Sequence, residues 1–87
     1  MDRLQPYVEE FGLYFERIGL PRMMGRIIGY LLVSEPAQQS MQDIGTALQA
    51  SKSAVSTALK ALVSLRLVDQ VVVPGERRDY YRANADM

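Results

Sequence analysis

The chain has 87 residues, 48% of them hydrophobic, and its ten basic and ten acidic side chains give a formal net charge of zero. It contains no cysteine and no histidine, which excludes a disulfide scaffold, Cys/His zinc sites, cysteine nucleophiles and Ser-His triads. This length suits one domain, so we expect residues 1–87 to form a single domain. We expect it to bind no metal and no cofactor.

The sequence predicts no membrane span, because Arg, Glu or Gln interrupt every apolar stretch well before the roughly 18 to 20 residues that a bilayer requires. The N-terminal residues MDRLQPYVEE do not have the pattern of a signal peptide. We therefore expect a soluble, cytoplasmic chain with no membrane partner.

Residues 1–20 are expected to form an N-terminal unit, with a helix from Tyr7 to Gly19. Its apolar side chains recur at helical spacing and cover more than one face of the helix; they are Tyr7, Val8, Phe11, Leu13, Tyr14, Phe15 and Ile18. So wide a stripe on a terminal helix packs either on its own core or also on a second chain. The residues that we expect at a homodimer contact are Tyr7, Phe11, Tyr14, Phe15 and Ile18.

A second helix is expected from Arg22 to Val33, because Pro21 is tolerated where a helix begins. Methionine and aliphatic side chains at helical spacing mark its core side; they are Met23, Met24, Ile27, Ile28, Leu31 and Leu32. Residues 34–39 are expected to form a linker, since Pro36 disfavours a helical backbone at the residue before it.

Residues 40–65 predict a helix-turn-helix unit. Ser40 and Asp43 have the spacing of a capping box at the start of a short helix, and Ser51 can cap a longer helix of residues 52–65. Residues 68–83 then predict two strands joined by the turn PGERR. The expected fold is mainly α with a small β-hairpin (α+β): a winged helix-turn-helix of four helices and a two-stranded wing.

The fourth predicted helix has a polar side suited to a polyanion. Hydroxyls and one lysine gather there: Ser53, Ser56, Thr57, Lys60 and Ser64. No carboxylate occurs from residue 52 to residue 68, whereas a solvated helix surface usually mixes acids with bases. Short hydroxyl side chains let a helix enter the major groove of DNA, and the helix start at Ser51 can meet a phosphate. The alternative is an exposed face that only contacts water.

The wing turn carries two adjacent arginines, Arg77 and Arg78, that turn chemistry does not require. Guanidinium groups on a thin hairpin are suited to the negative potential of a narrow minor groove. We expect Glu76 and Asp79 to hold these guanidiniums in place. The alternative is a turn with local ion pairs, each worth about 0 to 1 kcal/mol, that has no partner.

Three segments together resemble the winged-helix transcriptional regulators of the MarR superfamily, most closely the GbsR-like subgroup: GLPRMMGRIIGYLL (19–32), SKSAVSTALKALVSLRLV (51–68) and VPGERRDYYRA (73–83). The resemblance implies a bacterial or archaeal homodimer that binds a palindromic double-stranded DNA operator and senses a small-molecule effector such as an osmolyte. The residues that it places at DNA are Ser51, Lys52, Ser53, Ser56, Thr57 and Lys60 in the major groove, with Arg77 and Arg78 in the minor groove.

The sequence also departs from that family. Gln49 and Arg66 stand where such proteins often place a glycine after a helix, and a non-glycine residue with left-handed backbone is disfavoured by on the order of 1 kcal/mol. Family members usually continue past the wing into helices that complete the dimer, whereas this chain stops at Met87. Either the chain is a fragment, or the first helix alone must support pairing.

Two other functional classes compete with DNA recognition. A winged helix can serve as a protein-docking module without DNA affinity, and the zero net charge favours that alternative. An enzyme is the least favoured class, because the chain has neither a catalytic His or Cys nor a Gly-rich phosphate loop.

Overall fold

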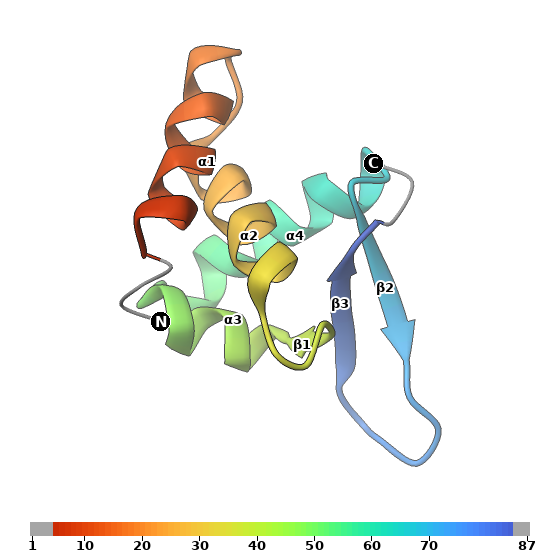
Figure 1. Cartoon of the computed structure of the whole chain (residues 1–87). Helices are drawn as coiled ribbons and strands as arrows, with labels where there is room; N and C mark the ends of the chain where they lie inside the picture. Colours follow the sequence, from red (N-terminus) through yellow and green to blue (C-terminus); the bar gives the residue numbers. More distant parts are fainter. Residues whose placement is uncertain (1–4, 85–87) are drawn as a thin grey trace.

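The computed structural model describes residues 5–84, so the ends of the predicted single domain, residues 1–4 and 85–87, lie outside the described residues. Its elements follow the order α1 (Gln5–Arg17), α2 (Arg22–Val33), β1 (Gln39–Ser40), α3 (Met41–Leu48), α4 (Lys52–Ser64), β2 (Val68–Val72) and β3 (Asp79–Ala83). Figure 1 shows the helices α1 to α4 grouped together and the β2–β3 hairpin extending beyond them. The predicted winged helix-turn-helix is confirmed.

Helix α1 spans Gln5–Arg17 among the described residues, so it ends two residues before the predicted Gly19 and already includes the two residues before the predicted Tyr7. Pro6 is tolerated where it lies near the N-terminal end of a helix, because its missing N–H then needs no helical partner. Gly19 takes a left-handed backbone with φ of 88°, which ends the helical path before α2.

Helices α1 and α2 approach so closely that their glycines are needed. A Cβ atom added to Gly25 would overlap the backbone carbonyl of Phe11, and one added to Gly29 would lie 3.1 Å from the Phe11 ring. The glycines therefore let α2 pack against the backbone of α1.

The sheet has three antiparallel strands in the order β1-β3-β2. The short strand β1, which pairs Gln39 with Tyr81 and Ser40 with Tyr80, falls at the end of the predicted linker and was not predicted. Gln39 is buried with both ends of its side-chain amide hydrogen-bonded: the oxygen accepts from the Tyr30 hydroxyl at 2.7 Å and the nitrogen donates to the Pro36 carbonyl at 2.8 Å.

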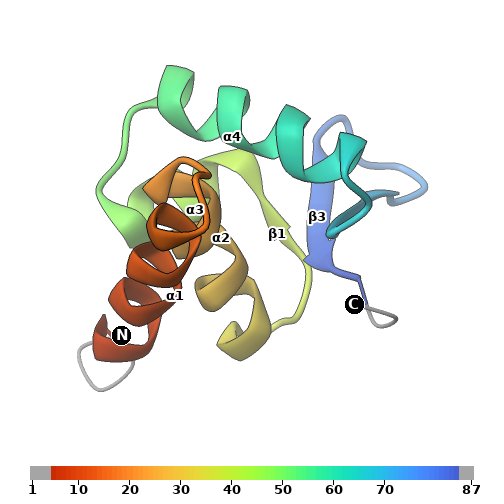
Figure 2. The ribbon, with the colours of Figure 1, turned by 90° about the horizontal axis from the view of Figure 1, so that it is seen from above.

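A single hydrophobic cluster joins the helices to the base of the wing. Its most deeply buried apolar members come from α1, α2, α3, α4 and β2: Val8, Ile27, Ile28, Ile44, Val55, Leu59, Leu62 and Val68. Figure 2 shows α4 lying along one side of the other helices, with the wing at the end of α4. None of the helices between residues 5 and 84 combines the length and hydropathy needed to cross a lipid bilayer.

Replacing Gly25 with alanine tests the close approach of α1 and α2. Helix propensity alone favours alanine by about 1 kcal/mol. We expect Gly25→Ala instead to lower the free energy of unfolding by about 3 kcal/mol, because the new methyl group meets backbone that cannot move aside. Urea unfolding followed by circular dichroism measures the change, and an equal or higher stability would contradict the packing.

Candidate nucleic-acid interface

Both helices of the helix-turn-helix begin at side-chain caps. The Ser40 hydroxyl accepts from the Asp43 amide at 3.1 Å while the Asp43 carboxylate accepts from the Ser40 amide at 3.0 Å, which completes the predicted capping box. The Ser51 hydroxyl accepts from the Ala54 amide at 3.1 Å. Each predicted cap is confirmed, and together they fix where α3 and α4 start.

The two positions where glycine was missing have left-handed backbone, with φ of 53° at Gln49 and 62° at Arg66. Gln49 directly follows α3 and turns the chain toward Ser51 and α4. Arg66 lies between α4 and β2 and turns the chain into the wing. The two strained residues thus sit at the connections that aim α4 and the wing.

Helix α4 is divided between core and surface as predicted. Val55, Ala58, Leu59 and Leu62 are buried. Along the opposite side, Ser53, Thr57, Lys60 and Ser64 are exposed, and Ser56 is half-buried. Both Lys52 and Ser51 are also exposed at the start of the helix. No predicted major-groove residue is lost to the core.

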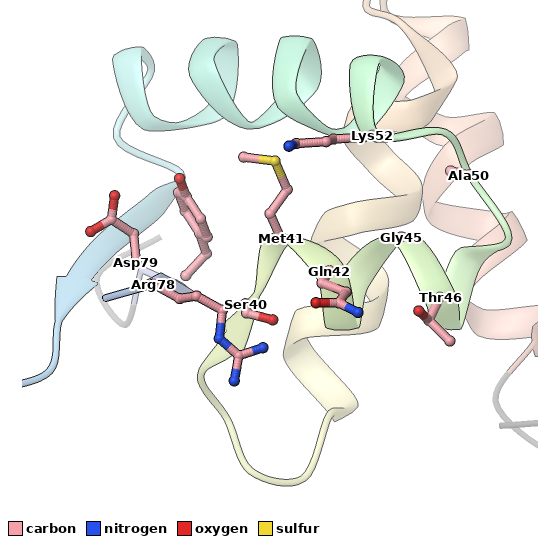
Figure 3. Close-up of a pocket in the computed structure, with 10 residues that line it drawn as sticks. Ser40, Met41, Gln42, Gly45, Thr46, Ala50, Lys52, Arg78 and Asp79 are labelled. Atoms are coloured by element: carbon pink, nitrogen blue, oxygen red, sulfur yellow. The ribbon is translucent and has the colours of Figure 1, made fainter. Parts of the chain in front are cut away.

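A hollow of about 600 Å³ separates α3 and α4 from the wing. Lys52 lines it from the first turn of α4, and Arg78 lines it from the residue before β3. Figure 3 shows these two cations approaching from different sides, with Ser40 and Met41 between them. The hollow therefore brings a predicted helix contact and a predicted wing contact onto one concave surface.

A second hollow of about 270 Å³ continues this surface along α4, lined by Ser56, Lys60 and Ser64 together with Gln70 and Tyr81. These three α4 residues follow Lys52 at intervals of four, so all four side chains form one row that faces the wing. Ser53 and Thr57 form the adjacent, more exposed row.

The floor of the hollows is neutral. Tyr81 is buried and lines both of them. Burial raises the pKa of its phenol above the ordinary value, and the nearby carboxylate of Asp79 adds to the shift. The ring therefore stays uncharged at neutral pH and does not repel an anion that enters the hollow.

The acids of the wing do not hold its arginines, contrary to the prediction. Asp79 instead accepts from the Gln70 side-chain amide at 2.8 Å, and Glu76 accepts from the Tyr80 hydroxyl at 3.2 Å. Strand alternation explains the first contact, because Gln70 pairs with Tyr81 and Asp79 lies two residues along the same face. Within residues 5–84, no ion pair joins Arg77 or Arg78 to a carboxylate.

The predicted dimer residues divide into two sets. Phe15 is only 7% exposed and belongs to the core of its own chain, and Phe11 packs partly buried against that core; these two are therefore not free surface contacts. Tyr7, Tyr14 and Ile18 are exposed, with Tyr14 at 57%, and Leu13 is exposed as well. The apolar surface left on α1 is narrower than predicted.

A sequence profile of the MarR family matches residues 18–79. The chain belongs to the MarR family. The match runs from the end of α1 through the helix-turn-helix to the start of β3, and so includes the wing turn and all the residues that line the two hollows except Tyr81.

A curated protein and a solved structure are similar to nearly the whole chain. The HTH-type transcriptional regulator MmpR5 of Mycobacterium tuberculosis is 39% identical over 79 residues, which cover 91% of this chain and 48% of that protein. A crystal structure described as a transcriptional regulator superposes with a TM-score of 0.91 at 37% identity, over 97% of this chain and 57% of its own. Both are regulators, in agreement with the prediction of a regulator rather than an enzyme.

A crystal structure of the Staphylococcus aureus MepR–DNA complex is also similar, with a TM-score of 0.71 and 25% identity over 83% of this chain and 59% of that chain. The present chain spans about half the length of its curated mycobacterial relative and somewhat more than half of these structures.

Sequence reasoning missed the part of the surface that α3 contributes. Gln42 and Thr46 line the larger hollow, and both are exposed. Their spacing of four places them on one side of α3, opposite the buried Ile44 and Leu48. The sequence shows two polar residues on the solvent side of a capped helix, but only the position of the wing shows that this side lines the hollow.

Replacing Ser40 with alanine tests the capping box. We expect Ser40→Ala to lower the free energy of unfolding by about 1 kcal/mol, because the Asp43 amide loses its acceptor. Ser53→Ala on the exposed side of α4 is the control and should change stability by less than about 0.5 kcal/mol. Equal effects in chemical denaturation would show that the cap contributes nothing particular.

Proposed function

We propose that this chain is a sequence-specific DNA-binding unit of a transcriptional regulator, in which α4 enters the major groove and the wing arginines enter the adjacent minor groove. The observation that carries the proposal is the shared concave surface between α4 and the wing, lined by Lys52 and Arg78. The DNA complex of the related MepR supports the same partner.

This arrangement assigns a place to the DNA backbone. A single sugar-phosphate strand separates the major groove from the neighbouring minor groove. If α4 lies in one groove and the wing in the other, that strand must cross the surface between them, where the hollow lies. The strand then passes between Lys52 and Arg78, and Gln42 and Thr46 on α3 can donate hydrogen bonds to its phosphates.

The charge of this surface suits the proposal although the whole chain is neutral. Lys52, Lys60, Arg77 and Arg78 are exposed on α4 and the wing. Against these four cations stand the two carboxylates that flank the wing arginines, Glu76 and Asp79, which accept hydrogen bonds from Tyr80 and Gln70. The field at the interface is thus locally positive, which matters more for phosphate binding than the sum over the chain.

We further propose a homodimer that pairs through exposed apolar side chains of α1 and of the residue after it: Tyr7 and Tyr14 at helical spacing, Leu13 beside them, and Ile18 directly past the helix end. Exposed aromatic and aliphatic side chains on one helix favour an apolar partner. A two-fold pair would present two α4 helices about 34 to 36 Å apart and would read a palindromic operator.

Within the MarR family we propose the GbsR-like subgroup, supported by residues 19–32, 51–68 and 73–83. A regulator of this kind acts on the chromosome in the cytoplasm and responds to a small-molecule effector. The hollows at α4 and the wing face the proposed DNA, so we do not place the effector there.

Salt-dependent DNA binding tests the proposed interface. We expect Lys60→Ala and Arg78→Ala each to weaken operator binding and to reduce the slope of log affinity against log salt concentration by about 0.9, the value of one lost phosphate contact. Fluorescence anisotropy with operator and scrambled duplexes measures both quantities.

Arg82→Ala is the matched control for Arg78→Ala. Arg82 lies on β3, next to the buried Tyr81 and therefore on the opposite face, with its guanidinium 3.8 Å from Asp69. This variant should keep the wild-type slope. DNA binding without salt dependence would contradict the proposed interface. If no duplex is bound while a protein partner is bound tightly, the docking alternative replaces DNA recognition.

Sedimentation equilibrium tests the pairing of α1. We expect the wild-type chain to dimerise and Tyr14→Glu to remain monomeric, because the new carboxylate would have to be buried without a partner. Thr57→Glu, on the exposed side of α4, should dimerise like wild type. A wild-type chain that is monomeric at every concentration studied would rule out α1 as a sufficient dimer contact.

A further inference from the structure

Arg26, in the middle of α2, connects two other helices through one guanidinium. Its Nε donates to Oε2 of Glu9 on α1 at 3.2 Å, and its Nη2 donates to the carbonyl oxygen of Leu48, the last residue of α3, at 3.0 Å. The arginine side chain is only 18% exposed. The Glu9 side chain is 37% exposed, so solvent weakens the ion pair in part, whereas the Arg26 guanidinium itself is largely sheltered from water.

Helix α1 fixes this arginine along its whole length. A Cβ atom added to Gly12 would lie 3.0 Å from Cγ of Arg26, so the α1 backbone rests on the aliphatic stem. Glu9, one turn earlier on α1, holds the guanidinium. The stem and the head of Arg26 therefore both depend on where α1 lies.

The other end of the connection is the turn of the helix-turn-helix. The final carbonyls of a helix lack helical partners, and a cation there is favourable. The carbonyl of Leu48 belongs to the peptide plane that leads into Gln49, whose backbone is left-handed with φ of 53°. Arg26 thus holds the plane that precedes the strained residue and helps to set the direction of α4.

We propose that Arg26 is a positioning residue for DNA recognition, because it ties α1, through Glu9, to the turn that aims α4. This inference rests on the proposed DNA-binding function. It makes one side chain the link between the helix proposed to pair two subunits and the helix proposed to read the operator. Lysine cannot replace it, since a single ammonium group lacks the planar set of donors that reaches Glu9 and Leu48 together.

Arg26→Lys tests the tie while keeping the charge. We expect its affinity for the operator to fall about tenfold, the effect of one charge-assisted hydrogen bond, while its affinity for a scrambled duplex is unchanged. Arg22→Lys is the matched control, because Arg22 lies one turn earlier on α2 and is exposed; it should behave as wild type toward both duplexes. Glu9→Gln should reduce operator preference in the same direction as Arg26→Lys.

Amide hydrogen exchange provides the readout that a merely structural role would not give. The Gln49 amide donates to Thr46 and the Ala50 amide to Gly45 within the turn. In Arg26→Lys these two amides should exchange about tenfold faster, with the amides of Ile27, Ile28 and Leu31 in the core of α2 unchanged. Faster exchange at all five positions, with both duplexes bound more weakly, would show general destabilisation and overturn the proposal.

The two proposals fail in different ways. If the wild-type protein binds neither duplex, DNA recognition fails, and exchange at Gln49 and Ala50 still decides whether Arg26 controls the turn. If wild type prefers the operator and Arg26→Lys keeps that preference, or if exchange at these two amides does not change, the positioning role of Arg26 is wrong while DNA recognition stands.

Discussion

The position of the wing depends on Ser40, which belongs to the sheet and to the helix-turn-helix at once. Its backbone pairs with Tyr80 on β3, and its side chain and amide complete the capping box with Asp43 at the start of α3. Because one residue serves the two purposes, the base of the wing is joined directly to the start of α3. The hollow is therefore framed by elements that are tied together through Ser40, and a preformed surface loses less entropy when it binds.

Much of this fold could be predicted because its signals are local. The caps at Ser40 and Ser51, the apolar spacing of α2 and the turn between the wing strands depend on neighbouring residues, and each predicted element is present. Strand β1 could not be found in this way, since two polar residues have no periodicity and pair only because β3 returns to them. The division of α1 was missed for a similar reason. Spacing placed Phe15 and Tyr14 in one stripe, but the position of α2 decides which of them is covered.

The candidate site shows the same limit. The hydroxyl and cation pattern of α4 was readable in the sequence, and the paired arginines of the wing were conspicuous. The carboxylates that those arginines can contact depend on the strand register. In the observed register of the described strands, Asp79 accepts a hydrogen bond from Gln70 and does not pair with the arginines. The contributions of Gln42 and Arg26 could be found only in the assembled structure, because each depends on a residue more than 20 positions away in the chain. Gln42 lines a hollow together with Arg78, and Arg26 donates to Leu48. Local chemistry thus predicted the exposed polar groups of α4 and the wing better than the contacts that hold those groups in place.

The strand order β1-β3-β2 leaves β2, among the described residues, with a hydrogen-bonded neighbour on one side only. An edge strand of this kind is a template on which another chain can extend the sheet, and its valine content and the 74% exposure of Val72 increase that risk of aggregation. Its length of five residues, the Pro74 that follows and the nearby charge pair of Asp69 and Arg82 all oppose such growth. The same short length that makes the wing a thin hairpin thereby also limits its capacity to seed intermolecular β-structure.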